Sequence, residues 1–452
     1  MFHRVLIANR GEVAVRIART LRALGIVPIG IASRPDLAMS WTGAMEEVVC
    51  VGEAAAGQSY LDMERIVQAA RQTRCSALHP GWGFLAENKR FAALCHQHGL
   101  VFIGPPAAAM ALMGVKSPAK AAMRRAGLDV VPGSDGPLPD ANAAAACAAR
   151  IGYPAILKAD FGGGGRGMRL CRDEAELREA FGAAAAEAAA AFGSGSLYLE
   201  RYLAGGRHIE VQVLCDSHGN AIHVGERECS IQRKHQKLIE ESPSPALGDA
   251  ERAALGERAA RAAARLGYRN AGTIEFLRAA SGELYFMEMN TRLQVEHPVS
   301  EMVSGLDIVA EQVRIAANHP LGRTQDEVKL AGHAIECRIN AEDPAAGFRP
   351  APGRLEVFAF ATGAGPGTVR VDTHLAPGDE VTPHYDSLLA KVIAHGATRA
   401  KAIATMIAAL SGSRVEGVKT TIPMHLAVLA SDAFRRGEYD TLTIPGWRGG
   451  GA

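Results

Sequence analysis

The chain has 452 residues, of which 48% are hydrophobic and 21% are charged, and its formal net charge is +1. That length favours about three domains with large cores, and the balanced charge gives no support to a nucleic-acid or acidic-membrane partner. The first residues lack a secretory signal pattern, and no apolar run is long enough to span a bilayer. Because the 8 cysteines are scattered without a CxxC pair, we expect reduced thiols and a cytoplasmic protein.

The first part of the chain alternates strand and helix signals. A buried strand is predicted at Val5–Ala8, a helix at Glu12–Leu24 and a second strand at Ile26–Ile31, which together form a βαβ opening. The alternation continues with a helix at 60–73, a strand at 77–79, a helix at 91–97 and a strand at 101–103. We therefore predict an open, mostly parallel sheet that extends to about residue 112. Its first strand turn, Asn9-Arg10-Gly11, lacks the G-x-G-x-x-G signature, which disfavours a dinucleotide site there.

A second region begins near Met113 and contains a strand, a glycine loop and another strand over residues 154–172. Gly162, Gly164 and Gly167 match the dinucleotide spacing, but a strand follows them in place of the required helix. We predict a glycine hairpin whose backbone N–H groups close over phosphates, with Lys158 as a point charge at the end of the incoming strand. A flexible surface loop is the alternative.

The remaining elements are predicted from propensity and periodicity. Asp173 should cap an alanine-rich helix at Glu174–Phe192, because aspartate is a preferred N-cap residue and alanine the strongest helix former. Strands are predicted at 197–203, 208–214 and 221–224. After Arg323 the pattern changes to a proline-punctuated, β-rich segment through Ile393, followed by helices at about 400–410 and 424–429, which we interpret as a third domain.

The most informative segment is a predicted β-hairpin within residues 272–296. Ser281-Gly282 is a turn signal between two runs of strand formers, and a turn centred there places Glu275 directly across from Glu288. Asn290 then shares the face of Glu288. Two carboxylates whose Cβ atoms are roughly 5 Å apart repel by about 3 kcal/mol at an effective dielectric of about 20, so we expect a cation between them. Two carboxylates and an amide oxygen suit Mg²⁺ or Mn²⁺ better than zinc; a solvent-facing pair of glutamates is the alternative.

The order of these features resembles the ATP-grasp family and, more closely, the biotin carboxylase component of biotin-dependent carboxylases. The resemblance covers nearly the whole chain and is carried by Ile7-Ala-Asn-Arg-Gly-Glu12, His79-Pro-Gly-Trp-Gly-Phe-Leu-Ala-Glu-Asn88, Glu228-Cys-Ser-Ile-Gln-Arg-Lys-His-Gln-Lys237, Glu288-Met-Asn-Thr-Arg-Leu-Gln-Val-Glu-His-Pro298 and Glu336-Cys-Arg-Ile-Asn-Ala-Glu-Asp-Pro344. It implies a fold of α/β and α+β class. The parts would be an N-terminal open parallel αβ sheet at 1–112, an ATP-grasp domain at 113–323 whose glycine-hairpin lid covers about 131–203, and a β-rich C-terminal biotin carboxylase domain at 324–447.

The resemblance also implies roles for single residues. Glu275, Glu288 and Asn290 would hold Mg²⁺ or Mn²⁺, and ATP would be the substrate beside it. The residues expected to bind ATP are Lys116, Lys158, Gly163, Gly164, Gly165, Met168, Glu200, Arg201, Leu203, His208, Gln232, His235 and Leu277. Those expected to bind bicarbonate are Lys237, Arg292, Gln294 and Val295, and Arg338 is expected to bind biotin.

Arg292, Gln294 and Glu296 alternate, so an extended backbone after Asn290 would project all three to one side. Arg292 could then fork onto two oxygens of a small planar anion, as Lys237 adds charge and the Val295 N–H donates. Glu296 resembles the general base that removes the bicarbonate proton. A plain Arg–Glu salt bridge is the alternative.

Arg338 is similar to the arginine that stabilises the enolate of biotin, although it could also simply bridge strands. Arg292, Glu296, Arg338 and Lys237 are thus the predicted catalytic residues. The implied reaction joins bicarbonate to the γ-phosphate of ATP and then carboxylates biotin. The alternatives are a different ATP-grasp ligase and a non-catalytic nucleotide-binding subunit.

The sequence contains no Ala-Met-Lys-Met biotinylation motif. Biotin is therefore expected on a carrier domain or protein supplied in trans. Further expected partners are a carboxyltransferase subunit and, in a homodimer, a second copy of this chain. Asp160-Phe161 departs from the small residues that relatives usually carry before the glycines, which leaves the behaviour of the lid open.

Overall fold

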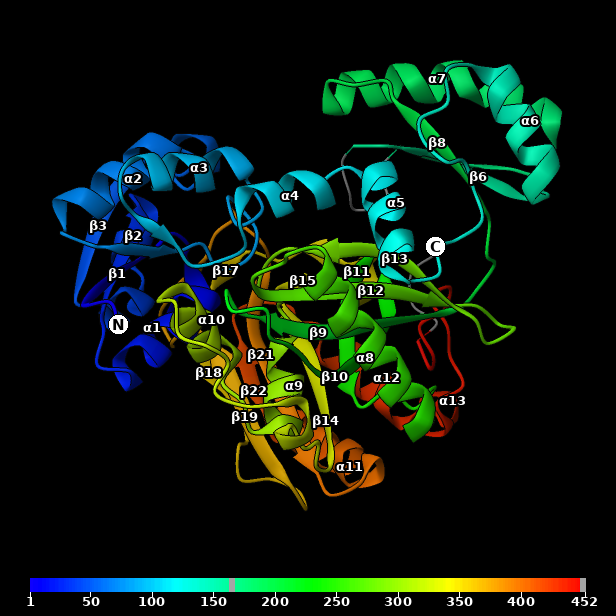
Figure 1. The fold of residues 1–452 in the computed structure, drawn as a ribbon. Coiled ribbons are helices and arrows are strands. Elements are labelled where there is room, and N and C mark those ends of the chain that lie inside the picture. Colours follow the sequence, from blue (N-terminus) through cyan, green and yellow to red (C-terminus); the bar gives the residue numbers. More distant parts are fainter. Residues whose placement is uncertain (162–166, 448–452) are drawn as a thin grey trace.

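The computed structural model describes residues 1–161 and 167–447, so Gly162 and three of the expected ATP-binding residues, Gly163, Gly164 and Gly165, lie outside the described residues. Figure 1 shows three parts: an N-terminal sheet in blue, a small lobe built from α6, α7, β6 and β8, and a large body that runs from green to red. Helices α4 (Ala107–Met113) and α5 (Lys116–Ala126) lead from the first part toward the lobe.

The N-terminal sheet is parallel, with strand order β3-β2-β1-β4-β5. This confirms the predicted alternation, although the strand at Glu47–Gly52 was not predicted, and α2 starts at Met63 because the Asp62 carboxylate accepts from the Arg65 N–H and caps the helix. Its elements are β1 (Arg4–Ile7), α1 (Gly11–Ala23), β2 (Val27–Ser33), η1 (Pro35–Ala38), η2 (Ser40–Ala44), β3 (Glu47–Gly52), η3 (Ala56–Gln58), α2 (Met63–Gln72), β4 (Ala77–His79), α3 (Lys89–Gln97) and β5 (Val101–Phe102).

The small lobe has a three-stranded antiparallel sheet of order β7-β6-β8, covered by two alanine-rich helices. Asp173 caps the second helix through the Glu176 N–H, as predicted. The elements are α6 (Ala141–Ile151), β6 (Ala155–Ala159), β7 (Met168–Cys171), α7 (Glu174–Phe192) and β8 (Leu197–Arg201). The last strand ends two residues before the predicted end at Leu203.

The body is an eight-stranded antiparallel sheet of order β13-β12-β9-β10-β11-β14-β21-β19. The pairing of β11 with β14 carries this sheet across the predicted boundary at 323/324. The elements are β9 (Arg207–Cys215), β10 (Ala221–Arg233), β11 (Gln236–Ser242), α8 (Asp249–Arg265), β12 (Asn270–Arg278), β13 (Leu284–Asn290), α9 (His297–Ser304), α10 (Ile308–Ala316), η4 (Gln325–Glu327), β14 (His333–Asn340), β19 (Thr368–Thr373), β21 (Leu388–Gly396), α11 (Arg399–Ser411), α12 (Ile422–Ala430) and α13 (Asp432–Arg436).

Short two-stranded pairings decorate the C-terminal part of the body. They are β15 (Glu342–Asp343) with β16 (Arg349–Pro350), β17 (Gly353–Arg354) with β20 (Glu380–Val381), and β18 (Val357–Ala359) with β22 (Arg414–Glu416); η5 (Pro344–Ala346) lies within the first.

The two faces of the large sheet differ in polarity. Ile209, Val211 and Val213 of β9 pack with α8 in an apolar core. The alternate residues of the same strand, His208, Glu210 and Gln212, are buried and polar, and strand alternation places them on the opposite face. That second face carries the candidate site.

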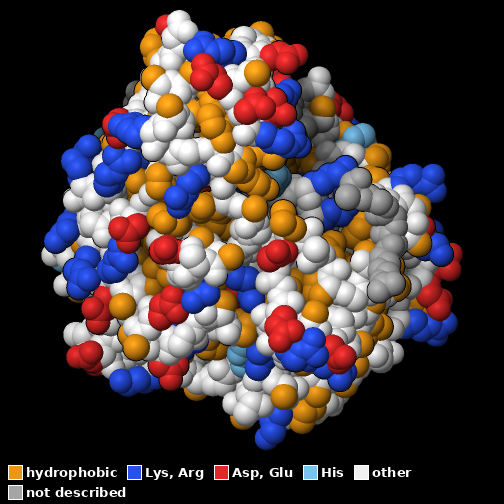
Figure 2. Space-filling model, turned by 90° about the vertical axis from the view of Figure 1, so that its right-hand side faces the viewer, with side chains coloured by type: hydrophobic (Ala, Val, Ile, Leu, Met, Phe, Trp, Pro, Cys, Tyr) orange, Lys and Arg blue, Asp and Glu red, His pale blue; other side chains and the backbone are white. Residues whose placement is uncertain are grey.

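Within residues 1–161 and 167–447, none of the helices has the length and apolar content that a membrane crossing requires. Figure 2 shows acidic and basic side chains intermixed over one face of the molecule, in keeping with the net charge of +1.

Candidate active site

The predicted pairing of Glu275 with Glu288 is confirmed. The turn itself is centred one half-residue earlier than predicted, because Arg278 pairs with Leu284 and the Ala279 N–H donates to the Glu283 carbonyl at 2.8 Å. A register shift between Glu275 and Phe276 leaves Met287 as an extra residue in β13. This β-bulge restores the register, so that both carboxylates lie on the polar face.

The two facing acids have different surroundings. Glu275 accepts from the Asn290 Nδ2 at 2.8 Å and from the Lys237 Nζ at 3.0 Å, and its other oxygen lies 3.2 Å from the His208 Nε2. Burial opposes ionisation of Glu275, but Lys237 and His208 outweigh it and lower its pKa. Burial and the charge of Glu275 raise the pKa of Glu288, against the opposing effect of Lys116.

This donor set fits a hard divalent cation. Two carboxylates and the Asn290 side-chain oxygen are ligands that Mg²⁺ and Mn²⁺ prefer, and a cation between Glu275 and Glu288 would remove the repulsion that raises the pKa of Glu288.

Lys237 stands at the centre of the polar face. Its Nζ lies 2.5 Å from Glu210, 3.0 Å from Glu275 and 2.6 Å from Glu296. Burial disfavours the charged ammonium, but the three carboxylates raise the pKa of Lys237 well above its usual value. Glu210 was missed by sequence reasoning; the alternation of polar residues in β9 was the signal that could have found it.

Glu296 joins Lys237 to Arg338. It is fully buried, and its second oxygen accepts from the Arg338 Nη2 at 2.9 Å. Although burial opposes ionisation, Lys237 and Arg338 lower the pKa of Glu296 well below its usual value. Arg338 also donates from Nε to Glu240 at 2.7 Å, a second carboxylate that the sequence analysis missed.

The expectation of an extended backbone after Asn290 is wrong. Strand β13 ends at Asn290, and α9 begins at His297 with Pro298 in its first turn. As a result Arg292 and Glu296 have different partners: the Arg292 Nε donates to Glu87 at 2.9 Å and its Nη2 donates to the Asn290 Oδ1 at 3.1 Å. Glu87, on the loop before α3, was not predicted. Proline in a first helical turn is the sequence signal that would have predicted this helix start.

Two other expected anion-binding residues lie in the same turn. The Gln294 Nε2 is buried and has no hydrogen-bond acceptor among the described residues. The Val295 carbonyl accepts from the Lys391 Nζ at 2.9 Å. Gln294 therefore retains an amide donor for a ligand.

The lysines expected to bind phosphate approach the acidic hairpin from the side of the lobe. Lys116 is the first residue of α5, and Lys158 on β6 donates to Glu200 at 2.5 Å. Burial lowers the pKa of Lys116, with Glu288 opposing and Lys158 adding to the effect. Glu200 also pairs with Lys120, which the sequence analysis missed.

The other expected nucleotide residues are spread along the strands around this point. Met168 pairs with Lys158, Leu277 with His208, and Gln232 with Lys237. Arg201 ends β8 and its N–H donates to the Pro132 carbonyl at 2.8 Å, Leu203 follows in the connection to β9, and His235 lies exposed at the turn between β10 and β11.

Asp160 is buried at the root of the lobe and ties it to α5. Its carboxylate accepts from the Ser117 N–H at 2.8 Å and from the Ser117 hydroxyl at 2.9 Å. The neighbouring Lys116 N–H donates to the Asp160 carbonyl at 3.1 Å. The unusual residue before the glycines thus holds the helix end that carries Lys116.

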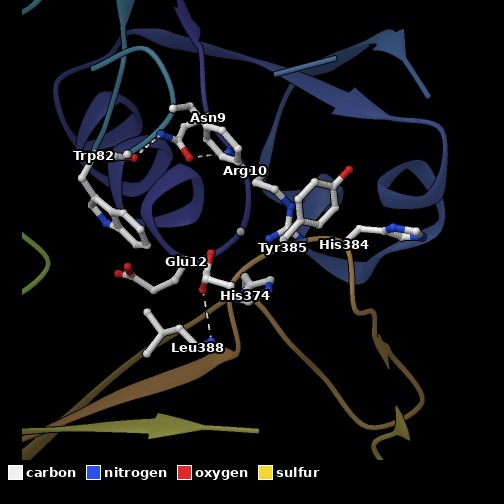
Figure 3. A pocket seen from close by; sticks show the side chains of 12 residues that line it. Asn9, Arg10, Glu12, Trp82, His374, His384, Tyr385 and Leu388 are labelled. Carbon is white, nitrogen blue, oxygen red and sulfur yellow. Dashed lines mark hydrogen bonds between the residues drawn. The ribbon is translucent and has the colours of Figure 1, made fainter. Parts of the chain in front are cut away.

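A separate cavity of about 220 Å³ lies between the turn after β1 and the segment before β21, as Figure 3 shows. Arg10 in its wall is bound by the Asp36 carboxylate and stacks on the Tyr385 ring at 4.1 Å. His374 packs over Gly11 at the start of α1. A side chain therefore covers the helix start, which differs from the open helix N-terminus of a dinucleotide fingerprint.

Family models match the chain in three stretches. Residues 1–110 match the biotin carboxylase N-terminal domain, residues 116–324 the ATP-binding domain of carbamoyl-phosphate synthase L chain, and residues 336–445 the biotin carboxylase C-terminal domain.

Curated relatives match over nearly the full length. The biotin carboxylase of Pseudomonas aeruginosa is 50% identical over 97% of this chain and 96% of its own, and that of Nostoc is 49% identical over 97% and 98%. Biotin carboxylase 1 of Bacillus subtilis is 48% identical over 98% of this chain and 98% of its own.

Solved structures agree with these sequence matches. The biotin carboxylase of Campylobacter jejuni superposes with a TM-score of 0.93 at 46% identity, covering 98% of each chain. The biotin carboxylase domain dimer of Hydrogenobacter thermophilus 2-oxoglutarate carboxylase, solved with MgADP, ADP and bicarbonate, gives 0.93 at 46% identity over 98% of this chain and 96% of its own. This chain belongs to the biotin carboxylase family, as its sequence and its fold show and as the polar face around Lys237 supports.

Proposed function

We propose that this chain carboxylates biotin with bicarbonate in a reaction driven by ATP cleavage, the first half-reaction of a biotin-dependent carboxylase. One observation carries the proposal: the Glu296 carboxylate lies between Lys237 and Arg338, next to the facing acids Glu275 and Glu288. A base, an anion-binding lysine, an arginine and a cation site thus converge on one buried face.

The nucleotide would bind between the lobe and this face. Lys116 and Lys158 supply positive charge for its phosphates, and Mg²⁺ held by Glu275, Glu288 and Asn290 would neutralise the charge that develops on them. The Hydrogenobacter thermophilus domain was solved with MgADP and bicarbonate, which supports the same ligands here.

In the first step Glu296 takes the proton of bicarbonate. A bicarbonate oxygen then bonds to the γ-phosphorus as the bond to the bridging oxygen breaks, which gives carboxyphosphate and ADP. Arg292, the Gln294 amide, the Val295 N–H and Lys237 would orient the bicarbonate. Because Lys237 and Arg338 lower the pKa of Glu296, drawing either cation toward a substrate anion would make Glu296 a stronger base.

In the second step the C–O bond of carboxyphosphate breaks to give CO₂ and phosphate. Phosphate takes the proton of the biotin ureido nitrogen, and that nitrogen bonds to CO₂. Arg338 would stabilise the negative charge on the ureido oxygen, a contribution of about 3 to 4 kcal/mol for a fixed cation at such a site.

The partners follow from this chemistry. We propose that a biotinylated carrier domain or protein reaches the site in trans and that a separate carboxyltransferase subunit uses the product. The Hydrogenobacter thermophilus relative is a dimer, which supports a homodimer here. A cytoplasmic location is supported by cysteines that are all free, seven of them buried.

The test is to measure ADP release with and without bicarbonate and with and without free biotin. We expect release to need bicarbonate and to rise when biotin is added. ATP turnover that ignores both substrates would exclude the proposal and point to another ATP-grasp ligase or to a nucleotide-binding subunit.

A further inference from the structure

Two buried glutamates lie behind Arg338. Glu240 on β11 and Glu336 on β14 are paired directly across the two strands, and both are completely buried. Glu336 and Arg338 are two residues apart on β14, so strand alternation places them on the same face. Lys237 and Glu240 are three residues apart on β11, but Leu238 between them is an extra residue at a register shift. This β-bulge brings Glu240 to the same face as Lys237.

The hydrogen bonds of the pair are incomplete in a specific way. One oxygen of Glu240 accepts from the Arg338 Nε at 2.7 Å. The other oxygen of Glu240 and both oxygens of Glu336 are buried and have no donor among the described residues. Buried carboxylates without donors are costly. A single proton held between the opposed carboxyl groups would satisfy two of these three oxygens, one that carries the proton and one that accepts it. Opposed side chains have Cβ atoms about 5 Å apart, which allows that contact.

The cations around Glu336 in the described part of the chain are bound to other groups. Lys391 of β21 lies 2.9 Å from the Glu12 carboxylate of α1 and donates to the Val295 carbonyl. Arg338 is bound by Glu240 and Glu296. His297 of α9 is kept neutral, since burial and the nearby cations lower its pKa.

The cations on the opposite face of the sheet are also bound to another acid. There Arg399 of α11 and His333 of β14 both bind Glu241. Burial therefore dominates for this pair: it raises the pKa of Glu336 well above its usual value and that of Glu240 to about 7.

We propose that Glu240 and Glu336 share one proton and act as positioning residues that hold Arg338 beside the site of carboxylation. The inference rests on the proposed function, in which Glu296 becomes neutral when it takes the bicarbonate proton. At that moment Arg338 loses one anionic partner. Glu240 remains as its anionic partner. Because Glu336 carries the proton, the pair has one negative charge in total, and the guanidinium of Arg338 stays in place for the biotin step.

The test uses the full chain with free biotin as the probe, and it compares Glu240→Gln and Glu336→Gln with Glu226→Gln. Glu226 is a matched control because it is a buried acid bound to Arg252, on the neighbouring strand β10 and outside the proposed site. Melting temperature reports folding for each variant. The readouts are bicarbonate-dependent ADP release without biotin, and kcat and KM for biotin across the pH range.

For Glu240→Gln we expect the KM for biotin to rise about tenfold or more, with ADP release in the absence of biotin reduced by less than about threefold. Glu226→Gln should change melting temperature only. Equal losses in both assays, or an unchanged KM for biotin, would overturn the positioning role. Loss of bicarbonate-dependent ADP release in the wild type would instead overturn the proposed function, so the two failures are distinguishable.

The shared proton has its own readouts. In the wild type, loss of this proton at alkaline pH creates a second anion behind Arg338 and should raise the KM for biotin. Glu336→Gln cannot ionise, so that alkaline rise should disappear. The infrared difference spectrum between wild type and Glu336→Gln should also show the C=O band of a protonated carboxyl group. An alkaline limb that persists in the variant, or the absence of that band, would show that Glu336 does not hold the proton.

Discussion

Glu240 and Glu241 are neighbours on β11 with the same side chain, yet they lie in opposite electrostatic surroundings. Glu241 accepts hydrogen bonds from Arg399, His333 and Tyr439. Although burial opposes its ionisation, His333 and Arg399 lower the pKa of Glu241 to about 2. Glu240 shares Arg338 with Glu296 and faces Glu336, and burial raises its pKa to about 7.

The difference follows from the side of the sheet that each residue faces. On one face, Glu241 and its cross-strand neighbour Glu228 each bind several donors of their own, an arrangement that is complete without a ligand. On the other face, acids outnumber the cations that reach them. Such an excess of buried negative charge persists only if protons, metal ions or cationic groups of ligands complete it. The ratio of buried acids to the cations that contact them therefore distinguishes the face that carries the candidate site from the opposite face.

The largest effect should come from Glu296, the buried acid between Lys237 and Arg338. Glu296→Gln keeps the shape but cannot take a proton, so we expect carboxylation and bicarbonate-dependent ADP release to fall by about 10²- to 10⁴-fold. ATP binding, measured by calorimetry, should persist. Turnover at the wild-type level would remove Glu296 from the role of base.

Arg338 separates the two half-steps. Arg338→Gln removes the cation beside biotin, and we expect carboxybiotin formation to fall by about 10²- to 10³-fold. Bicarbonate-dependent ADP release without biotin should fall much less. The variant is compared with wild type by measuring ADP and carboxybiotin in the same reaction. Parallel losses of both products would place Arg338 in the first step.

Glu241 should matter for stability and not for catalysis. Glu241→Gln should cost about 3 kcal/mol of unfolding free energy at neutral pH, since the folded carboxyl has a pKa of about 2 against an ordinary 4.5. Because the folded pKa is lowered, this stabilisation is present above about pH 4.5 and is lost as pH falls toward 2.

Urea unfolding at neutral pH and near about pH 3 measures this change. The difference between wild type and Glu241→Gln should shrink at the acid end, and kcat of the folded variant should match wild type. A pH-independent difference would mean that packing, and not charge, is lost.

The smallest effect is expected at the root of the lobe. Asp160→Ser shortens the side chain that binds both the N–H and the hydroxyl of Ser117, at a cost of about 1 to 2 kcal/mol. Since Lys116 starts the same helix, we expect the KM for ATP to rise about three- to tenfold with little change in kcat. Ser117→Ala, which loses only the hydroxyl contact, should give a smaller rise. Equal KM values for wild type and Asp160→Ser would show that the contact does not position Lys116.

Strand alternation and propensity were enough to predict much of the architecture. The N-terminal parallel sheet, the cap at Asp173 and the pairing of Glu275 with Glu288 all follow from local pattern and are confirmed. These features depend on residues close together in the chain, where periodicity and turn signals act directly.

The features that could not be predicted depend on register and on distant strands. Met287 in β13 and Leu238 in β11 are extra residues that form β-bulges and shift the alternation of side chains. No local sequence pattern predicts these bulges. Glu210 and Glu240 become site residues only through β9 and β11, whose neighbours β12 and β14 come much later in the chain. Glu87 reaches Arg292 from the loop before α3, about 200 residues earlier in the chain. Long-range pairing supplied these contacts.

The continuity of the eight-stranded sheet has a consequence during synthesis. Strand β11 ends at Ser242, but its partner β14 begins only at His333. A ribosome that adds roughly 5 to 20 residues per second leaves that edge open for about 5 to 20 s. An unpaired strand edge can pair with other chains. During this period the nascent protein is therefore prone to aggregate with other copies of itself, and a chaperone that covers the edge would raise the yield of folded protein.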